Sequence, residues 1–75
     1  MVWRRNMAVN YNKLWKILID KGMRKEDLRL QAGLTTNVIA KLGRNENVNT
    51  KALAKICKVF DCNIGDIMDF VEVDK

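Results

Sequence analysis

The chain has 75 residues and a net charge of +5, and it contains no histidine and only two cysteines. This length suits one domain, and a hydrophobic fraction of 48% is too high for a disordered chain. No stretch approaches the ~20 apolar residues of a membrane span, and the commonest catalytic base is missing. We therefore expect a cytoplasmic protein that is not an enzyme, with no membrane partner, small-molecule substrate, metal or cofactor.

Residues 1–9 are expected to form an N-terminal arm, and a helix is predicted for residues 10–21. The first six residues leave three alternatives open, an arm that reaches DNA, a strand, or an upstream start of translation, and we expect a loosely ordered terminus. In the helix, Asn10 or Asn12 can cap the start, and Gly22 is a natural residue to end it. The helix has one apolar face, in which the tryptophan is expected to belong to the core: Tyr11, Leu14, Trp15 and Leu18.

The next two predicted helices, residues 25–32 and 36–43, are joined by a short turn that contains glycine. Gly33 permits the left-handed backbone of a sharp turn, and Thr35 is a suitable N-cap for the second helix. Each helix has apolar residues on one side: Leu28 and Ala32 in the first, and Val38, Ile39 and Leu42 in the second. Two short helices joined in this way form the helix-turn-helix unit.

Two further helices are predicted at residues 50–60 and 64–70, followed by an acidic tail over residues 71–75. Thr50 is the expected N-cap of the first, whose apolar stripe is Leu53, Ile56, Cys57 and Phe60. The last apolar residues alternate with acids, which leaves an extended segment as the alternative. The two cysteines, Cys57 and Cys62, match no common zinc spacing and are expected to be reduced and buried.

The resulting fold class is all-α, with five helices over residues 10–70. A short β pairing between the terminal segments, residues 2–8 and 70–73, is a further possibility within this prediction. The charge distribution divides the domain from its tail: residues 1–60 carry thirteen Lys or Arg and four Asp or Glu, and residues 61–75 carry one Lys and five acids. The balance of +9 on the body favours a nucleic-acid partner, because phosphate neutralisation releases counterions.

The helix at residues 36–43 can place its polar side in a major groove about 12 Å wide. Asparagine there can contact adenine, lysine can reach guanine, and a threonine or alanine methyl can touch thymine. The predicted DNA-binding residues are Lys25, Thr35, Thr36, Asn37, Ala40, Lys41, Arg44 and Asn45. Three alternatives remain: the solvated face of a surface helix, a non-specific nucleoid protein, and a helical protein-interaction module such as an antitoxin or anti-repressor adaptor.

Four segments carry a resemblance to a known family: Gly33-Leu34-Thr35, Ile39-Ala40-Lys41-Leu42, Leu53-Ala54-Lys55-Ile56-Cys57 and Asp61-Cys62-Asn63-Ile64-Gly65-Asp66-Ile67. Over residues 10–70 the chain resembles the phage repressor and Cro family, and more narrowly the small Xre-type regulators. The resemblance implies a five-helix bundle whose third helix reads DNA through Thr36, Asn37 and Lys41.

The chain departs from the family pattern at two positions. Arg29 stands where the family usually has alanine, so its stem must extend outward or the two helices must separate. Lys25 stands where the family usually has glutamine, near the DNA backbone.

The resemblance and the charge pattern together predict a sequence-specific transcriptional regulator that binds double-stranded DNA, acts as a repressor and forms a homodimer. A two-fold dimer would read a palindrome whose half-sites lie about 34 Å apart. The candidate dimer surface consists of the C-terminal apolar residues Ile67, Phe70, Val71 and Val73. The alternative is that these residues only close the core of the monomer.

Overall fold

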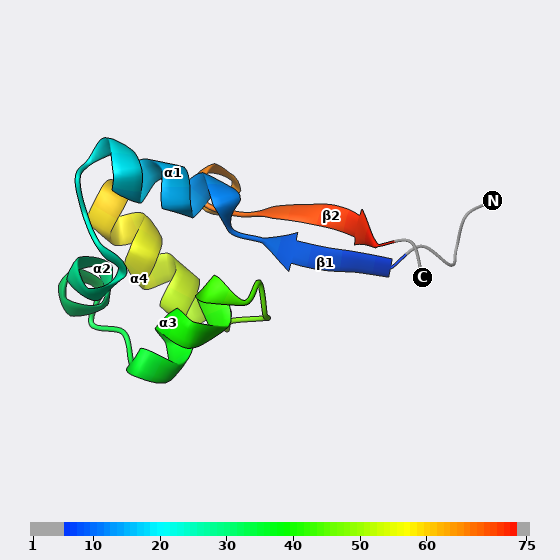
Figure 1. The fold of residues 1–75 in the computed structure, drawn as a ribbon, viewed down its shortest axis with the longest axis horizontal. Helices are drawn as coiled ribbons and strands as arrows, with labels where there is room; N and C mark the ends of the chain where they lie inside the picture. The colour runs from blue at the N-terminus through cyan, green and yellow to red at the C-terminus, as the bar shows by residue number, and fades with distance from the viewer. Residues whose placement is uncertain (1–5, 74–75) are drawn as a thin grey trace.

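The computed structural model describes residues 6–73, which form a helical body and a two-stranded arm (Figure 1). In these residues the body consists of α1 (Asn12–Asp20), α2 (Lys25–Ala32), α3 (Thr36–Gly43) and α4 (Thr50–Phe60). The arm pairs β1 (Asn6–Asn10) with β2 (Asp69–Val73), and a short 3₁₀ helix, η1 (Ile64–Asp66), leads from α4 to the arm.

Local side-chain chemistry explains where the first helices begin and end. The Asn10 side chain accepts a hydrogen bond from the Asn12 N–H (2.9 Å) as α1 begins, and Gly22 follows α1 with a φ of 64°. At the start of α2, the Arg24 N–H donates to the Asp27 carboxylate (2.9 Å). These side chains pair backbone N–H groups that a helix start leaves without partners.

The N-cap of α4 is Asn49 and not Thr50, so the predicted cap was wrong by one residue. The Asn49 side chain accepts from the Ala52 N–H (2.8 Å), and Thr50 is the first residue of the helix. Both side chains can cap, but asparagine ranks above threonine at this position. The body of the helix nevertheless follows the predicted bounds of 50–60.

The hydrophobic core is built around α4, which contacts α2 along the body and η1 at the entrance to the arm. Each of the four α-helices contributes to it, and its largest completely buried side chains are Tyr11, Leu14, Leu28, Leu42, Ile56 and Ile67. Burying side chains of this size is the main stabilising term available to so short a chain.

The arm confirms the predicted pairing of the two terminal segments and gives its register. Asn6 is opposite Val73 and Asn10 is opposite Asp69 in an antiparallel ladder. The strand β1 therefore ends two residues after the predicted Ala8, and β2 begins one residue before the predicted Phe70; residues 2–5 of that prediction lie outside the described residues. The expected division into an N-terminal arm (residues 1–9), a domain (10–70) and a tail (71–75) therefore cuts through both strands, because β1 runs to Asn10 and β2 starts at Asp69. The arm is fastened to α1 by Lys13, whose Nζ lies 3.1 Å from Asp69 and 3.0 Å from the Gly65 carbonyl.

The predicted fifth α-helix, residues 64–70, is not present. Its first residues form η1, in which the Asn63 N–H donates to the Asp66 carboxylate (3.0 Å), and β2 begins at Asp69. The aromatic and β-branched residues that follow favour a strand, and pairing with β1 satisfies their backbone groups.

The two cysteines are free, as predicted, but neither is completely buried. Cys57 and Cys62 are both half-buried and pack against the edge of the core. Burial raises the pKa of the Cys62 thiol, and the neighbouring Cys57 adds to that shift. A raised pKa keeps this thiol protonated at neutral pH, which suits a packing role.

Candidate nucleic-acid interface

The turn between α2 and α3 fixes the relative position of the two helices. Gly33 has a φ of 67°, as the sequence predicted, and the Leu34 N–H returns to the Arg29 carbonyl (2.9 Å). Leu34 is buried in the core immediately after the turn. Thr35 then accepts a hydrogen bond from the Val38 N–H (3.2 Å), which confirms it as the N-cap of α3. A helix that is capped and anchored in this way is a rigid support for surface side chains.

The third helix has one buried and one open face. Leu42 is completely buried, and Val38 and Ile39 are half-buried against the core. Thr36 and Asn37 are exposed. Of the other predicted DNA-binding residues, Thr35, Arg44 and Asn45 are exposed beside this face, and Ala40 and Lys41 are half-buried. The open face therefore carries two side chains that can contact base edges.

Lys25 lies at the start of α2, and its ammonium group faces the protein. Nζ is 4.7 Å from the centre of the Trp15 ring, close enough for a cation–π interaction. The same atom is 3.4 Å from the point where a Cβ on Gly43 would stand, so the charge lies near the C-terminal end of α3. A cation there is favoured by the helix dipole. Trp15 is half-buried and packs against the core, in agreement with its predicted role.

Arg29 resolves the first departure from the family pattern by pointing outward. Its guanidinium group pairs with the Glu26 carboxylate one turn earlier on α2, with Nε 2.9 Å from Oε1. This pairing lowers the pKa of Glu26, chiefly through the hydrogen bond from Arg29. Arginine can thus occupy this position without placing its charge between α2 and α3.

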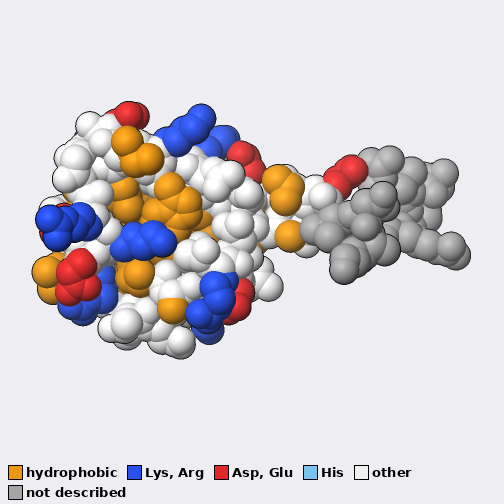
Figure 2. All heavy atoms as spheres, in the orientation of Figure 1, with side chains coloured by type: hydrophobic (Ala, Val, Ile, Leu, Met, Phe, Trp, Pro, Cys, Tyr) orange, Lys and Arg blue, Asp and Glu red, His pale blue; other side chains and the backbone are white. Residues whose placement is uncertain are grey.

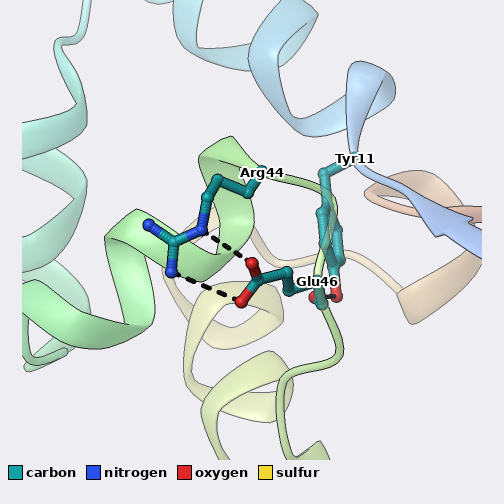
Figure 3. A network of polar contacts seen from close by, with 3 residues as sticks. All are labelled: Tyr11, Arg44 and Glu46. Atoms are coloured by element: carbon teal, nitrogen blue, oxygen red, sulfur yellow. Dashed lines mark hydrogen bonds and ion pairs between the residues drawn. The ribbon is translucent and has the colours of Figure 1, made fainter.

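The loop after α3 contains a network that the sequence analysis did not predict (Figure 3). Arg44 donates to the Glu46 carboxylate through Nε (2.7 Å) and a terminal nitrogen (3.3 Å), and this hydrogen bonding lowers the pKa of Glu46. The Tyr11 hydroxyl donates to the Glu46 carbonyl (2.8 Å), and the Asn45 side chain accepts from the Tyr11 N–H (3.2 Å). In the sequence, the one local indication of a turn here was Asn45, because asparagine tolerates the left-handed backbone better than most non-glycine residues. Its φ is 56°.

The helical body and the arm differ in the charged side chains that they carry, as Figure 2 shows for one face. Lys and Arg side chains are spread around the helical body, whereas the described part of the arm shows hydrophobic and acidic side chains on this face. Residues 7–10 and 69–72 contain no basic residue. Over residues 6–73, no helix has the length and apolar character needed to cross a membrane.

Comparisons with known proteins agree with this geometry. The model of the Cro/C1-type HTH DNA-binding domain matches residues 13–72. The chain belongs to the Cro/C1-type helix-turn-helix family. This confirms the resemblance found in the sequence.

One solved structure is similar to this Cro/C1-type domain over almost its whole length. The crystal structure of the transcriptional regulator VanUg, form II, shares 42% sequence identity with it, and the match covers 97% of each chain with a TM-score of 0.88. No curated protein matches the chain.

Proposed function

We propose that this protein is a sequence-specific, cytoplasmic regulator of transcription that binds double-stranded DNA and acts as a repressor. The observation that carries the proposal is the open face of α3, which presents Thr36 and Asn37 on a helix anchored by the completely buried Leu42. The family and the similarity to the regulator VanUg support the same function. Repression requires only that the bound protein occupy the promoter.

Each predicted DNA-binding residue has a role in this proposal. Thr36 and Asn37 contact base edges, and the Ala40 methyl contacts a thymine methyl. The cations bind phosphate or nearby bases: Lys25, Lys41 and Arg44. Thr35 caps the start of α3, Asn45 lies two residues beyond its end, and both border the DNA.

We further propose that two copies bind a palindromic site as a homodimer through the arm. Phe70 is 63% exposed on β2, and Met7 is 56% exposed on β1, which leaves apolar surface outside the monomer core. Val71, at 41% exposed, is also available, whereas Ile67 is completely buried and belongs to the core. One domain contacts a single half-site, and a second copy would double the contacts with DNA.

The proposed function is tested by selecting bound sequences from random duplex DNA and then measuring the affinity of variants for the selected site. Asn37→Ala should weaken binding by about 1–3 kcal/mol and relax the preference at one base pair. Lys25→Ala should weaken binding to all sequences alike and reduce the salt slope by about one. Gln31→Ala, an exposed amide on α2, is the matched control and should bind as the wild type does.

The outcomes separate this function from its alternatives. Selection of a defined sequence, combined with a loss of preference in Asn37→Ala, supports sequence-specific binding. Tight but sequence-independent binding would indicate a nucleoid protein. Absence of salt-dependent DNA binding would favour a protein-interaction module.

A further inference from the structure

Tyr11 joins three parts of the molecule that are distant in the sequence. It follows the last residue of β1, precedes the first residue of α1, and is completely buried. Its polar groups both bind the loop after α3: the hydroxyl donates to the Glu46 carbonyl (2.8 Å), and the main-chain N–H donates to the Asn45 side chain (3.2 Å). These partners are 35 and 34 residues away in the chain.

The loop needs such support because its backbone is not regular. Asn45 adopts a left-handed φ of 56°, a conformation that is uncommon for non-glycine residues, although asparagine tolerates it better than most. Its own N–H bonds to the Leu42 carbonyl (3.2 Å), and the Glu46 N–H bonds to the Lys41 carbonyl (2.9 Å). Tyr11 therefore contacts two consecutive residues of a turn that closes the C-terminal end of α3.

The same turn determines where Arg44 points. The Glu46 carboxylate binds the Arg44 guanidinium through two hydrogen bonds, of 2.7 Å and 3.3 Å, while the carbonyl of that same residue is held by Tyr11 (Figure 3). Arg44 is exposed and stands immediately after the last residue of α3. A long, mobile side chain of this kind loses rotamer freedom when it binds phosphate, and prior orientation reduces that cost.

We propose that Tyr11 is a positioning residue for DNA binding, which orients Arg44 by holding the Glu46 carbonyl at the end of α3. This inference rests on the proposed function, because it requires that Arg44 contact DNA. Tyr11 itself is completely buried and does not touch DNA. Burial also raises the pKa of its phenol, so the hydroxyl remains a hydrogen-bond donor at neutral pH.

The test uses Tyr11→Phe in the full chain, which removes the hydroxyl but keeps the buried ring and the main-chain N–H. Two measurements are made at a temperature where each variant is folded: hydrogen exchange of the amides at residues 45 and 46, and affinity for the selected duplex as a function of salt. Ile56→Val, a completely buried residue on α4, is the control for a general loss of core packing.

We expect faster exchange of the Asn45 and Glu46 amides in Tyr11→Phe, and not in Ile56→Val. DNA affinity should fall about threefold to tenfold, the range expected when one hydrogen bond is lost. If Tyr11 acts through Arg44, Tyr11→Phe should have little further effect in the Arg44→Ala background. The salt slope should fall in Tyr11→Phe as it does in Arg44→Ala.

Three results would overturn the inference. The first is unchanged exchange at residues 45 and 46, which would show that the hydroxyl does not hold the loop. The second is DNA binding by Tyr11→Phe equal to that of Ile56→Val, and the third is full additivity of Tyr11→Phe with Arg44→Ala. If the wild type binds no DNA, the proposed function has failed. Faster exchange at residues 45 and 46 in Tyr11→Phe would then still show that the hydroxyl holds the loop, so the two failures can be told apart.

Discussion

Two glycines of the helix-turn-helix unit should respond in opposite directions to the same substitution. Gly33 has a φ of 67°, and forcing alanine into this left-handed region costs about 1–2 kcal/mol. Alanine also restricts the unfolded chain, which offsets about 0.4–1 kcal/mol of that cost. Apart from the neighbouring residues of the chain, no atom lies within 4 Å of the added Cβ, so no steric clash adds to these two effects. We expect Gly33→Ala to lower the free energy of unfolding by about 1 kcal/mol.

Gly43→Ala should instead stabilise the protein. Gly43 is the last residue of α3 and lies outside the left-handed region, so alanine gains about 0.5–1 kcal/mol from its helix propensity. The added Cβ would lie 3.4 Å from the Lys25 Nζ, which is the end of a flexible side chain and can move. The two substitutions should therefore change the free energy of unfolding in opposite directions, because the two glycines differ in backbone conformation.

Thermal unfolding followed by circular dichroism, with urea unfolding at 25 °C as a second measure, tests this pair. For a domain of this size, 1 kcal/mol corresponds to about 4–8 °C in Tm. Gly33→Ala should melt below the wild type and Gly43→Ala should melt above it. Shifts in the same direction, or a Gly33→Ala variant as stable as the wild type, would refute the reasoning from backbone conformation.

Three further predictions concern the cap, the loop and the arm. Thr35→Ala removes the oxygen that accepts from the Val38 N–H and should cost about 1 kcal/mol in urea unfolding. Thr35→Ser keeps that oxygen, and an equal loss in both variants would contradict the capping role. Hydrogen bonding from Arg44 holds the pKa of Glu46 below its ordinary value of 4.5, so this contribution to stability is present above pH 4.5 and is lost as pH falls through the lowered pKa. Urea midpoints measured down to about pH 3 should therefore fall less steeply in Glu46→Gln, and an unchanged slope would show that the pair adds nothing. Phe70→Asp should abolish dimer formation in sedimentation experiments while leaving the helical spectrum intact; a wild type that stays monomeric while saturating a palindromic site would rule out the proposed dimer.

The similarity of the predicted and observed helical body has a local cause. The bounds of α2, α3 and α4 follow from apolar spacing, and the turn follows from Gly33 and Thr35, whose conformation and hydrogen bond depend on close neighbours in the chain. The predicted open face of α3 follows from the same spacing, because burying Leu42 leaves Thr36 and Asn37 outside.

The end of the chain was predicted less well because two local preferences compete there. Residues 64–70 contain enough apolar residues at helical spacing to suggest a helix, yet Phe70 and Val71 also favour a strand. The antiparallel register with β1 decided between them, since it pairs residues that are 59 to 67 positions apart in the chain. The pattern of residues 64–73 alone does not show that β1 will lie beside this segment.

The sequence by itself determined the helix-turn-helix unit, the basic body and the set of side chains on the open face of α3. Only the tertiary structure decided that Lys25 lies over Trp15, that Glu46 binds Arg44 while its carbonyl is held by Tyr11, and in which register β1 and β2 pair. Helical spacing and capping act over three or four residues and can be read from a short window. The orientation of a long charged side chain depends on partners that the fold brings together, and those partners lie far away in the sequence.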